Sequence, residues 1–305
     1  MKKDLLSFTD WSAKDLNALL QLAITIKNNP ADYRQALAGK SIVALFEKPS
    51  LRTRVSFDIG IHKLGGHLVY LDSQSNKLAG REDTKDMGNN LACWADAIVA
   101  RVFAHSTLEE LASAAKVPVI NALCDMYHPC QALADYLTLT ERFGDLSNVK
   151  LAYIGDGNNV THSLMIVGVT LGCEVVVITP PGYEVDPKIV ALTEQKAAEN
   201  GGKLVISTDI NAANGAHALY TDTWISMGDE TPIETIKQAF GKYKIDEAMM
   251  QSTGAQYVMH CQPAHRDLEI SGTLIDSKQS LLMQQAENRM HAQNAILVHI
   301  LGGAA

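Results

Sequence analysis

Short apolar runs alternate with helical stretches along most of the chain. Runs such as 41–46, 97–102 and 150–154 are rich in Val, Ile, Leu and Ala, and turn residues bound them, as is typical of buried strands. Between such runs, apolar residues recur at intervals of three and four, for example over 132–143. Strands that alternate with helices predict an α/β fold built on parallel sheets with helices on both faces.

The same pattern extends to the rest of the chain. The predicted strands occupy residues 41–46, 67–71, 97–102, 117–122, 150–154, 174–179, 203–207, 218–221 and 257–260. The predicted helices occupy a stretch that ends at Asn28 and residues 54–64, 83–95, 107–115, 132–143, 162–171, 187–200 and 284–301.

The alternation is interrupted once, at Gly144-Asp145-Leu146-Ser147, and then begins again. We therefore predict two α/β domains, residues 1–144 and 145–284. A C-terminal helix, residues 285–305, is predicted to pack back on the first domain.

Polar residues gather where the predicted strands end. Ser50 to Arg54 follow the first strand, Arg101 lies near the end of another, and Asp222 and Cys261 follow two more. In open parallel sheets, ligands bind beyond the carboxyl ends of the strands. The sequence therefore predicts an active site in a cleft between the two sheets.

The stretch from Pro49 to Arg54 has the chemistry of an anion site. Pro49 cannot donate to a strand ladder, so the strand before it should stop there. Ser50 stands where a helix N-cap belongs, and the first free N–H groups of a helix attract an anion. The planar forks of Arg52 and Arg54 match phosphate geometry. An ordinary capped helix with two solvated arginines is the alternative for this motif taken alone.

The length, composition and net charge of the chain exclude several classes of protein. The chain has 305 residues, of which 47% are hydrophobic and 20% charged, as in globular proteins. Its net charge of −8 gives no bulk attraction for nucleic acid or an acidic membrane, so a phosphate site must be local. No run of eighteen apolar residues and no apolar leader segment occurs, so we expect a cytoplasmic protein.

The cysteines predict free thiols. The chain has five cysteines, an odd number, widely spaced and without a Cys-x-x-Cys pair. That usage argues for a reducing compartment and against a disulfide framework or a structural metal site. We expect Cys93, Cys124 and Cys173 to be small core residues, and Cys130 to be structural.

Four motifs in order resemble the ornithine branch of the aspartate/ornithine carbamoyltransferase family. They are Ser50-Leu51-Arg52-Thr53-Arg54, His128-Pro129-Cys130-Gln131, Asp222-Thr223-Trp224-Ile225-Ser226-Met227-Gly228 and His260-Cys261-Gln262-Pro263. The first two are shared by the wider family, and the last two are more specific to the ornithine branch. The resemblance covers nearly the whole chain.

The resemblance implies transfer of a carbamoyl group from carbamoyl phosphate to the δ-amine of L-ornithine, with no cofactor and no metal. The first domain would bind carbamoyl phosphate, and the second would bind ornithine. The residues that would hold carbamoyl phosphate are Ser50, Leu51, Arg52, Thr53, Lys77, Arg101, His128, Gln131, Cys261, Gln262 and Arg289. Asn159, Asp222, Ser226 and Met227 would hold ornithine.

Among these residues, Arg52, Arg101, His128 and Cys261 would be catalytic. Two arginines and a histidine suit the phosphate that leaves and the oxyanion that forms, whereas Cys261 would lie near the attacking amine. The family implies a homotrimer or an assembly of trimers in which Lys77 of one subunit enters the neighbouring site. Gln262 departs from the leucine that is usual at its position.

Two further interpretations of the sequence stay open. One is carbamoyl transfer to another amine, such as putrescine, an acylated ornithine or aspartate. The other comes from a different class: Gly155-Asp156-Gly157 after a strand suggests a nucleotide-binding dehydrogenase or binding module. The third glycine of that motif is missing, because position 160 is Val160, and no acidic residue ends the next strand.

Overall fold

A computed structural model of the protein describes residues 4–72, 82–225 and 231–302. The chain divides into two compact units. The first comprises Met1–Leu137 and Asn288–Ala305, and the second comprises Thr138–Glu287. Helix α6 (Pro129–Phe143) begins in the first unit and ends in the second, and helix α12 (Leu282–Leu301) runs from the second back to the first.

Within the described residues, the first unit is built on four strands; one of its other helices precedes the first strand, and the rest lie between successive strands. The strands are β1 (Ser41–Phe46), β2 (His67–Asp72), β3 (Ala97–Arg101) and β4 (Val119–Leu123). The helices are α1 (Ala13–Asn28), α2 (Leu51–Lys63), α4 (Thr84–Leu91) and α5 (His105–Ala114).

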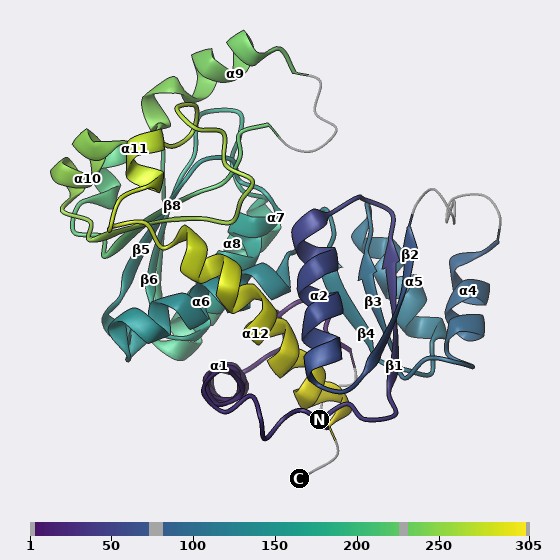
Figure 1. Ribbon diagram of the computed structural model, residues 1–305. Helices are drawn as coiled ribbons and strands as arrows, with labels where there is room; N and C mark the ends of the chain where they lie inside the picture. The colour runs from purple at the N-terminus through teal and green to yellow at the C-terminus, as the bar shows by residue number, and fades with distance from the viewer. Residues whose placement is uncertain (1–3, 73–81, 226–230, 303–305) are drawn as a thin grey trace. The chain divides into compact units, whose positions relative to one another are not determined.

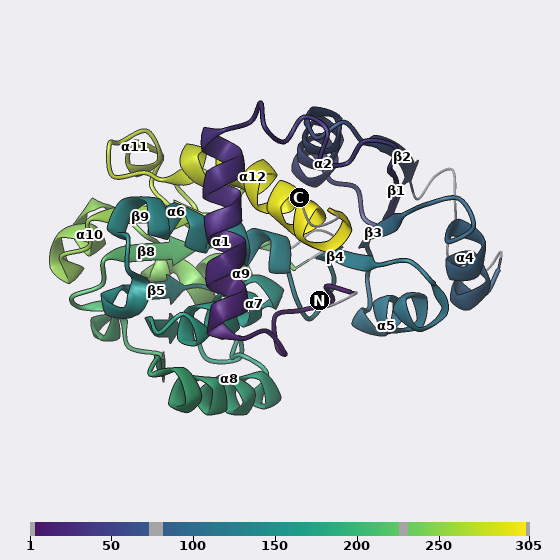
Figure 2. The same ribbon diagram turned by 90° about the horizontal axis from the view of Figure 1, so that it is seen from below.

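The four strands form a parallel sheet in the order β2-β1-β3-β4. The chain winds from β1 outward to β2 through α2, and then in the opposite direction through α4 and α5. Right-handed crossovers that run in opposite directions lie on opposite faces of a sheet. Figures 1 and 2 accordingly show α2 on one face of the sheet and α5 on the other.

One free edge of this sheet is covered by the start of the chain. Leu5 lies parallel to Ile120 of β4, its N–H donates to the carbonyl of Val119, and its carbonyl accepts from the N–H of Asn121. The side chain of Asn121 also donates to the carbonyl of Leu6 at 2.8 Å. These bonds satisfy backbone groups that would otherwise offer an open edge to other chains.

Within the described residues, the second unit is built on five strands. They are β5 (Lys150–Ile154), β6 (Glu174–Ile178), β7 (Lys203–Ser207), β8 (Ala218–Thr221) and β9 (Tyr257–His260). The α-helices are α7 (Asn159–Thr170), α8 (Pro187–Asn200), α9 (Ile233–Phe240), α10 (Glu247–Thr253) and α11 (Gly272–Ile275). Short 3-10 turns lie at Leu146–Asn148, Ile210–Ala213 and Gly241–Tyr243.

These strands form a second parallel sheet, in the order β7-β6-β5-β8-β9. One of its faces packs on α7 and α8. The other carries a hydrophobic core in which strand residues such as Ile154 and Val176 meet Tyr243, Met250 and Leu274. Every residue of α7 from Val160 to Thr170 is buried, as expected for a helix that is largely apolar all round.

Each sheet has one point at which its winding reverses. In the first sheet it lies between β1, whose crossover leads to β2, and β3, whose crossover leads to β4. In the second it lies between β5 and β8, which lead to β6 and β9. The crossover helices diverge there, so the space beyond the strand ends is left open to a ligand.

The prediction of parallel α/β sheets in two domains is confirmed, but several details were wrong. Ser50 is the N-cap of α2, as predicted, but the helix begins at Leu51, three residues before the predicted range of 54–64. Helices α9, α10 and α11 were not predicted; they are only eight, seven and four residues long. Cys93 is exposed, although it was expected in the core.

All five cysteines are free thiols, as predicted. Within the described ranges, no helix combines the length and apolar character needed to cross a membrane.

The close approach of α7 to the start of β7 makes Gly202 a stability test. A Cβ at Gly202 would lie 2.3 Å from the carbonyl oxygen and 2.7 Å from the Cα of Val169, both backbone atoms that cannot turn aside. We expect Gly202→Ala to lower the free energy of unfolding by about 1–3 kcal/mol, as measured by urea titration.

Gly241→Ala is the matched control, because nothing lies within 4 Å of a Cβ there and its φ of −53° is ordinary. Equal effects of the two substitutions would contradict the packing described.

Candidate active site

The turn after β1 builds a capped helix N-terminus. The Oγ of Ser50 accepts the N–H of Thr53 at 3.2 Å and donates to the Oγ1 of Thr53 at 2.9 Å. The remaining N–H groups of the first turn of α2 have no partner within a helix, so they can bind an anion. The side chain of Leu51 is 75% exposed, so any part it plays in a site falls to its N–H.

The hydroxyl of Thr53 joins two arginines from distant parts of the chain. Thr53 is fully buried in α2. Its Oγ1 accepts from Nη1 of Arg101, at the end of β3, at 3.4 Å and from Nη2 of Arg289, in α12, at 2.8 Å. Residues more than two hundred positions apart therefore meet at the winding reversal of the first sheet.

Arg289 also contacts both polar residues of the His-Pro-x-Gln motif. Its Nη1 donates to Oε1 of Gln131, and its Nη2 lies 3.1 Å from Nε2 of His128. A guanidinium only donates, so His128 accepts at Nε2 and carries its proton on Nδ1. Gln131 is fixed in turn, because its Nε2 donates to Oδ1 of Asp135 at 2.8 Å. We call Ser50, Thr53, Arg101, His128, Gln131 and Arg289 the anion cluster.

The anion cluster is strongly electropositive. Burial, and then the charge of Arg289, lowers the pKa of Arg101 to about 10. Burial, followed by Arg289 and Arg101, holds the pKa of His128 well below its usual 6.5, so this ring is neutral at physiological pH. In the part of the chain that the structure describes, Arg101 has no ion pair with a carboxylate. A buried cation without a counterion is costly, and a bound anion would remove that cost.

The other basic residues of this region lie outside the cluster. Arg54 is exposed, and its guanidinium lies 4.0 Å from the ring centre of Tyr70. Arg52 is half-buried. Burial and the charge of Arg101 lower the pKa of Lys48, whose ammonium lies 4.6 Å from the ring centre of Phe103.

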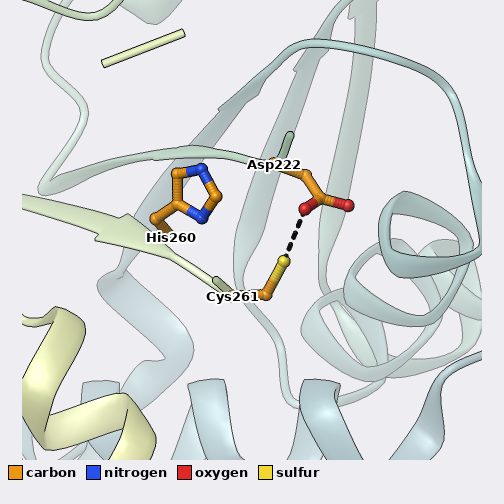
Figure 3. A group of neighbouring side chains, drawn as sticks. All are labelled: Asp222, His260 and Cys261. Atoms are coloured by element: carbon orange, nitrogen blue, oxygen red, sulfur yellow. Dashed lines mark hydrogen bonds between the residues drawn. The ribbon is translucent and has the colours of Figure 1, made fainter. Parts of the chain in front are cut away.

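A second group of polar residues lies at the winding reversal of the other sheet. Asn158 is the N-cap of α7 after β5, Asp222 follows β8, and Cys261 follows β9. The thiol of Cys261 donates to Oδ1 of Asp222 at 2.7 Å, and Nδ2 of Asn158 donates to Oδ2 at 3.1 Å. Figure 3 shows the thiol pointing toward the carboxylate. We call Asn158, Asp222 and Cys261 the carboxylate cluster.

The carboxylate of Asp222 is buried, with 7% of the residue exposed. Besides the thiol and the amide, it accepts the N–H of Thr223 at 2.7 Å. Within the described ranges it has no ion pair with Lys, Arg or His. Burial, with Asp222, Asp156 and Cys261 as further causes, keeps the pKa of Tyr153 well above its usual value. The cluster is therefore suited to a ligand with a positive charge.

The backbone around Cys261 is held by a buried histidine and glutamate. His260 and Glu269 are fully buried, and Nε2 of His260 lies 3.2 Å from Oε1 of Glu269. Nδ1 of His260 accepts the N–H of Gln262 at 2.8 Å. Gln262 has a φ of 61°, a left-handed conformation that side chains seldom adopt. Its carbonyl, rather than its unusual side chain, is the group assigned to carbamoyl phosphate by resemblance.

Asp222, His260 and Cys261 each offer a possible metal ligand, and these atoms lie within 4.8 Å of one another. Both ring nitrogens of His260 are engaged, however, with Glu269 and with the N–H of Gln262. Metal binding would have to break one of these buried bonds and the bond from Cys261 to Asp222. The geometry does not favour a metal centre.

The Gly155-Asp156-Gly157 turn, which suggested a nucleotide site, packs against another segment of the backbone. A Cβ at Gly157 would lie 2.5 Å from the backbone nitrogen of Val185 and 2.6 Å from the carbonyl carbon of Glu184. The N–H of Gly157 donates to the carbonyl of Tyr183 at 2.9 Å. Glycine is needed there because the chain's own backbone occupies the space that a Cβ would take.

The structure thus brings together most of the predicted residues, in two separate groups. Lys77, Ser226 and Met227 lie outside the described residues. Asn159, predicted to bind ornithine, is the first residue of α7, while its neighbour Asn158 makes the bond to Asp222. From the sequence, Asn158 was grouped with Asn159 in the turn after a strand and given no role of its own, although asparagine before a buried helix is a preferred N-cap.

Comparison with known proteins bears on both groups. Residues 3–141 match the family model described as the carbamoyl-P binding domain of aspartate/ornithine carbamoyltransferase, and residues 147–300 match its Asp/Orn binding domain. The chain belongs to the aspartate/ornithine carbamoyltransferase family. Except for Arg289, the anion cluster lies in the range of the carbamoyl-P binding domain, and the carboxylate cluster lies in that of the Asp/Orn binding domain.

Individual family members cover the chain almost completely. An ornithine carbamoyltransferase from Shewanella oneidensis is 57% identical over 97% of this chain and 98% of its own length. The solved ornithine carbamoyltransferase of Pyrococcus furiosus has a TM-score of 0.95 and 43% identity, covering 99% of this chain and 98% of that one. An acetylornithine transcarbamylase, solved with acetylcitrulline, has a TM-score of 0.89 and 30% identity, covering 99% of this chain and 100% of that one.

The low pKa of His128 predicts a pH-dependent contribution to stability. Because the pKa of the folded form lies below the unfolded value, near 6.5, the unfolded chain takes up this proton first as the pH falls. His128 therefore removes up to about 1.4 kcal/mol of stability per pH unit below that value. We expect His128→Gln to lose this part of the acid sensitivity.

The measurement is the free energy of unfolding by urea at pH 7.5 and 5.5 for both proteins. The stability of the wild type relative to the variant should decrease at the lower pH. A constant difference would show that His128 takes up its proton normally in the folded state.

Proposed function

We propose that the protein transfers the carbamoyl group of carbamoyl phosphate to the δ-amine of L-ornithine, forming L-citrulline and phosphate. The observation that carries the proposal is the anion cluster, a buried pair of arginines around Thr53 that lacks a carboxylate partner for Arg101. The match to a carbamoyl-P binding domain supports carbamoyl phosphate as the anion, and the similarity to ornithine carbamoyltransferases supports ornithine as the acceptor.

Carbamoyl phosphate binds at the first-turn N–H groups of α2 in this proposal. Ser50, Leu51, Arg52, Thr53, Arg101 and Arg289 hold its phosphate, and His128 and Gln131 contact its carbamoyl group. Because His128 is neutral, it acts as a hydrogen-bonding group rather than as an imidazolium that transfers a proton. The two arginines stabilise the negative charge that the departing phosphate carries.

Ornithine binds at the carboxylate cluster. The carboxylate of Asp222 is buried and has no cation partner in the described ranges, so a charged amino group of the substrate completes it. Asn159, Ser226 and Met227 are assigned to ornithine by resemblance. We assign carbamoyl phosphate to residues 1–144 and ornithine to residues 145–284, with the C-terminal helix 285–305 on the first domain.

Transfer proceeds by direct attack of the free δ-amine on the carbonyl carbon. The C–N bond forms, a tetrahedral oxyanion develops, and the C–O bond to phosphate then breaks. The proton released by the amine passes either to the departing phosphate or to the sulfur of Cys261, whose own proton must first pass to the Asp222 carboxylate that it contacts. The reaction involves no covalent enzyme intermediate and calls for no cofactor. The expected cleft between the two sheets stays a prediction.

The names of related enzymes support ornithine as the acceptor, but the fold alone does not distinguish it from other amines. Acetylornithine transcarbamylase has the same fold, so the acceptor depends on a few side chains rather than on architecture. Putrescine, an acylated ornithine and aspartate therefore remain the alternatives. A relative from Pyrococcus furiosus, 44% identical, is named as anabolic, which supports a role in arginine biosynthesis, and we place that role in the cytoplasm.

We further propose that the protein is a homotrimer or an assembly of trimers, with Lys77 entering a neighbouring site. An apolar stripe on α2 supports self-association. Leu51, Val55 and Ile59 follow one another at intervals of four, and they are 75%, 43% and 46% exposed. Such a stripe on one face of a helix is typical of a surface that a partner covers. We commit to a second copy of this chain as that partner.

The activity is tested with a panel of amines. Carbamoyl phosphate is supplied with ornithine, N-acetylornithine, putrescine, lysine or aspartate, and the carbamoylated product and phosphate are measured by mass spectrometry and colorimetry. We expect citrulline from ornithine, with the other amines at least about a hundredfold slower in kcat/KM.

Turnover of another amine instead of ornithine would retain the carbamoyl phosphate half of the proposal and overturn the assignment of the acceptor. No turnover of any amine, with no thermal shift from carbamoyl phosphate, would overturn both.

Self-association is tested by placing a charge in the stripe. We expect Ile59→Glu to shift the protein from trimer to monomer in sedimentation velocity, because burying an unpaired carboxylate at an interface is costly. Ile206→Glu is the matched control, since Ile206 lies in the second unit and is similarly exposed at 40%. A trimer that survives Ile59→Glu would show that the interface lies elsewhere.

A further inference from the structure

We propose that Asn158 is a positioning residue that sets the orientation of the Asp222 carboxylate, and so decides how tightly the amino-acid substrate is held. This inference rests on the proposed function and deepens it. Asn158 is not one of the residues that the resemblance assigned to either substrate.

Both halves of the Asn158 amide are engaged, in different directions. Oδ1 faces the helix and accepts the N–H of Val160 at 2.9 Å and that of Thr161 at 3.3 Å. Nδ2 faces the next strand and donates to Oδ2 of Asp222 at 3.1 Å. Because the cap fixes the oxygen of the planar amide, its nitrogen can only point toward Asp222.

The turn itself is held in place from behind. The carbonyl of Asp156 accepts from the hydroxyls of Tyr153 and Thr161, both at 2.8 Å, and Gly157 lies directly against the backbone at Glu184 and Val185. The backbone of such a turn can move little, so the Nδ2 of Asn158 stays in one position.

The other contacts of Asp222 leave its orientation dependent on this bond. Thr223 N–H and the Cys261 thiol both donate to Oδ1, at 2.7 Å each. Asn158 is the donor to Oδ2 within the described ranges. Without it, the carboxylate could rotate about the bonds to Oδ1, and the oxygen offered to an incoming ammonium would no longer be fixed.

The oxygen of the Asn158 amide caps α7 and its nitrogen orients Asp222, so a substitution can remove one role and keep the other. Serine also caps helices well, but its hydroxyl cannot both accept from α7 and reach Asp222. Asn158→Ser therefore keeps the helix and removes the bond to Oδ2. We expect its KM for ornithine to rise about tenfold or more, while its KM for carbamoyl phosphate and its melting temperature stay close to those of the wild type.

Asp186→Ser is the matched control. Asp186 caps α8 in the same unit, through a bond to the N–H of Lys188, and it does not contact Asp222. Its replacement should leave both KM values unchanged. If both cap variants raise the KM for ornithine equally, or if Asn158→Ser raises neither KM, the positioning role is overturned.

Asn158→Asp supplies a second readout that a purely structural role would not change. Aspartate caps as well as asparagine, but it places a carboxylate against Asp222, near Asp156, Tyr153 and the Cys261 thiol. Two carboxylates in contact share a proton at low pH, and the shared proton restores a hydrogen bond like that of the amide.

We therefore expect the ratio of kcat/KM for ornithine, Asn158→Asp over wild type, to rise at least about tenfold between pH 8.5 and pH 6. A ratio that does not change with pH would contradict the proposal. Wild-type turnover of ornithine decides the proposed function independently, before any variant is compared.

Discussion

The reversal of winding in each parallel sheet is the constraint on which both candidate clusters depend. Neighbouring strands that send their crossovers in opposite directions leave a gap beyond their carboxyl ends, because no helix can cover both at once. In the first unit, this brings the N-terminus of α2 beside the end of β3. In the second, it brings the N-terminus of α7 beside the end of β8. The same topology thus serves two sites of opposite charge.

The two clusters differ in what a ligand must supply. In the residues that the structure describes, the anion cluster holds the buried guanidinium of Arg101, which has no ion pair with a carboxylate, beside a neutral imidazole. Within the same residues, the carboxylate cluster holds the buried carboxylate of Asp222, which has no ion pair with a cation. A protein keeps such uncompensated buried charges only at some cost in stability, and carbamoyl phosphate and an amino acid are ligands that would offset it.

Sequence reasoning succeeded where a pattern reports local physics. Buried parallel strands are nearly continuous apolar runs, and the alternation with helices left little doubt about the sheets. Ser50 was recognised as a cap because proline and serine signal a strand end and a helix start. Short helices such as α10 and α11 gave no comparable signal, because seven or four residues are too few for a period to show.

The sites were harder, because their geometry is not local. No pattern reveals that Arg289 bonds to Thr53, Gln131 and His128 from a helix at the far end of the chain, and its assignment depended on resemblance. Asn158 was within reach of local reasoning as an N-cap, but its second bond depends on how β5 and β8 pair. Gly157 suggested a phosphate loop, because a glycine that admits a ligand and one that admits its own backbone look identical in a sequence.

The hydroxyl of Thr53, which Arg101 and Arg289 share, also affects the enthalpy of ligand binding. Arg289 is already bonded to an alcohol, an amide oxygen and an imidazole nitrogen before any anion arrives. An anion that recruits this guanidinium exchanges existing bonds for new ones rather than adding to an empty site. The enthalpy released on binding would therefore be smaller than a count of contacts in the bound state suggests, because the bonds that are lost offset part of those that form.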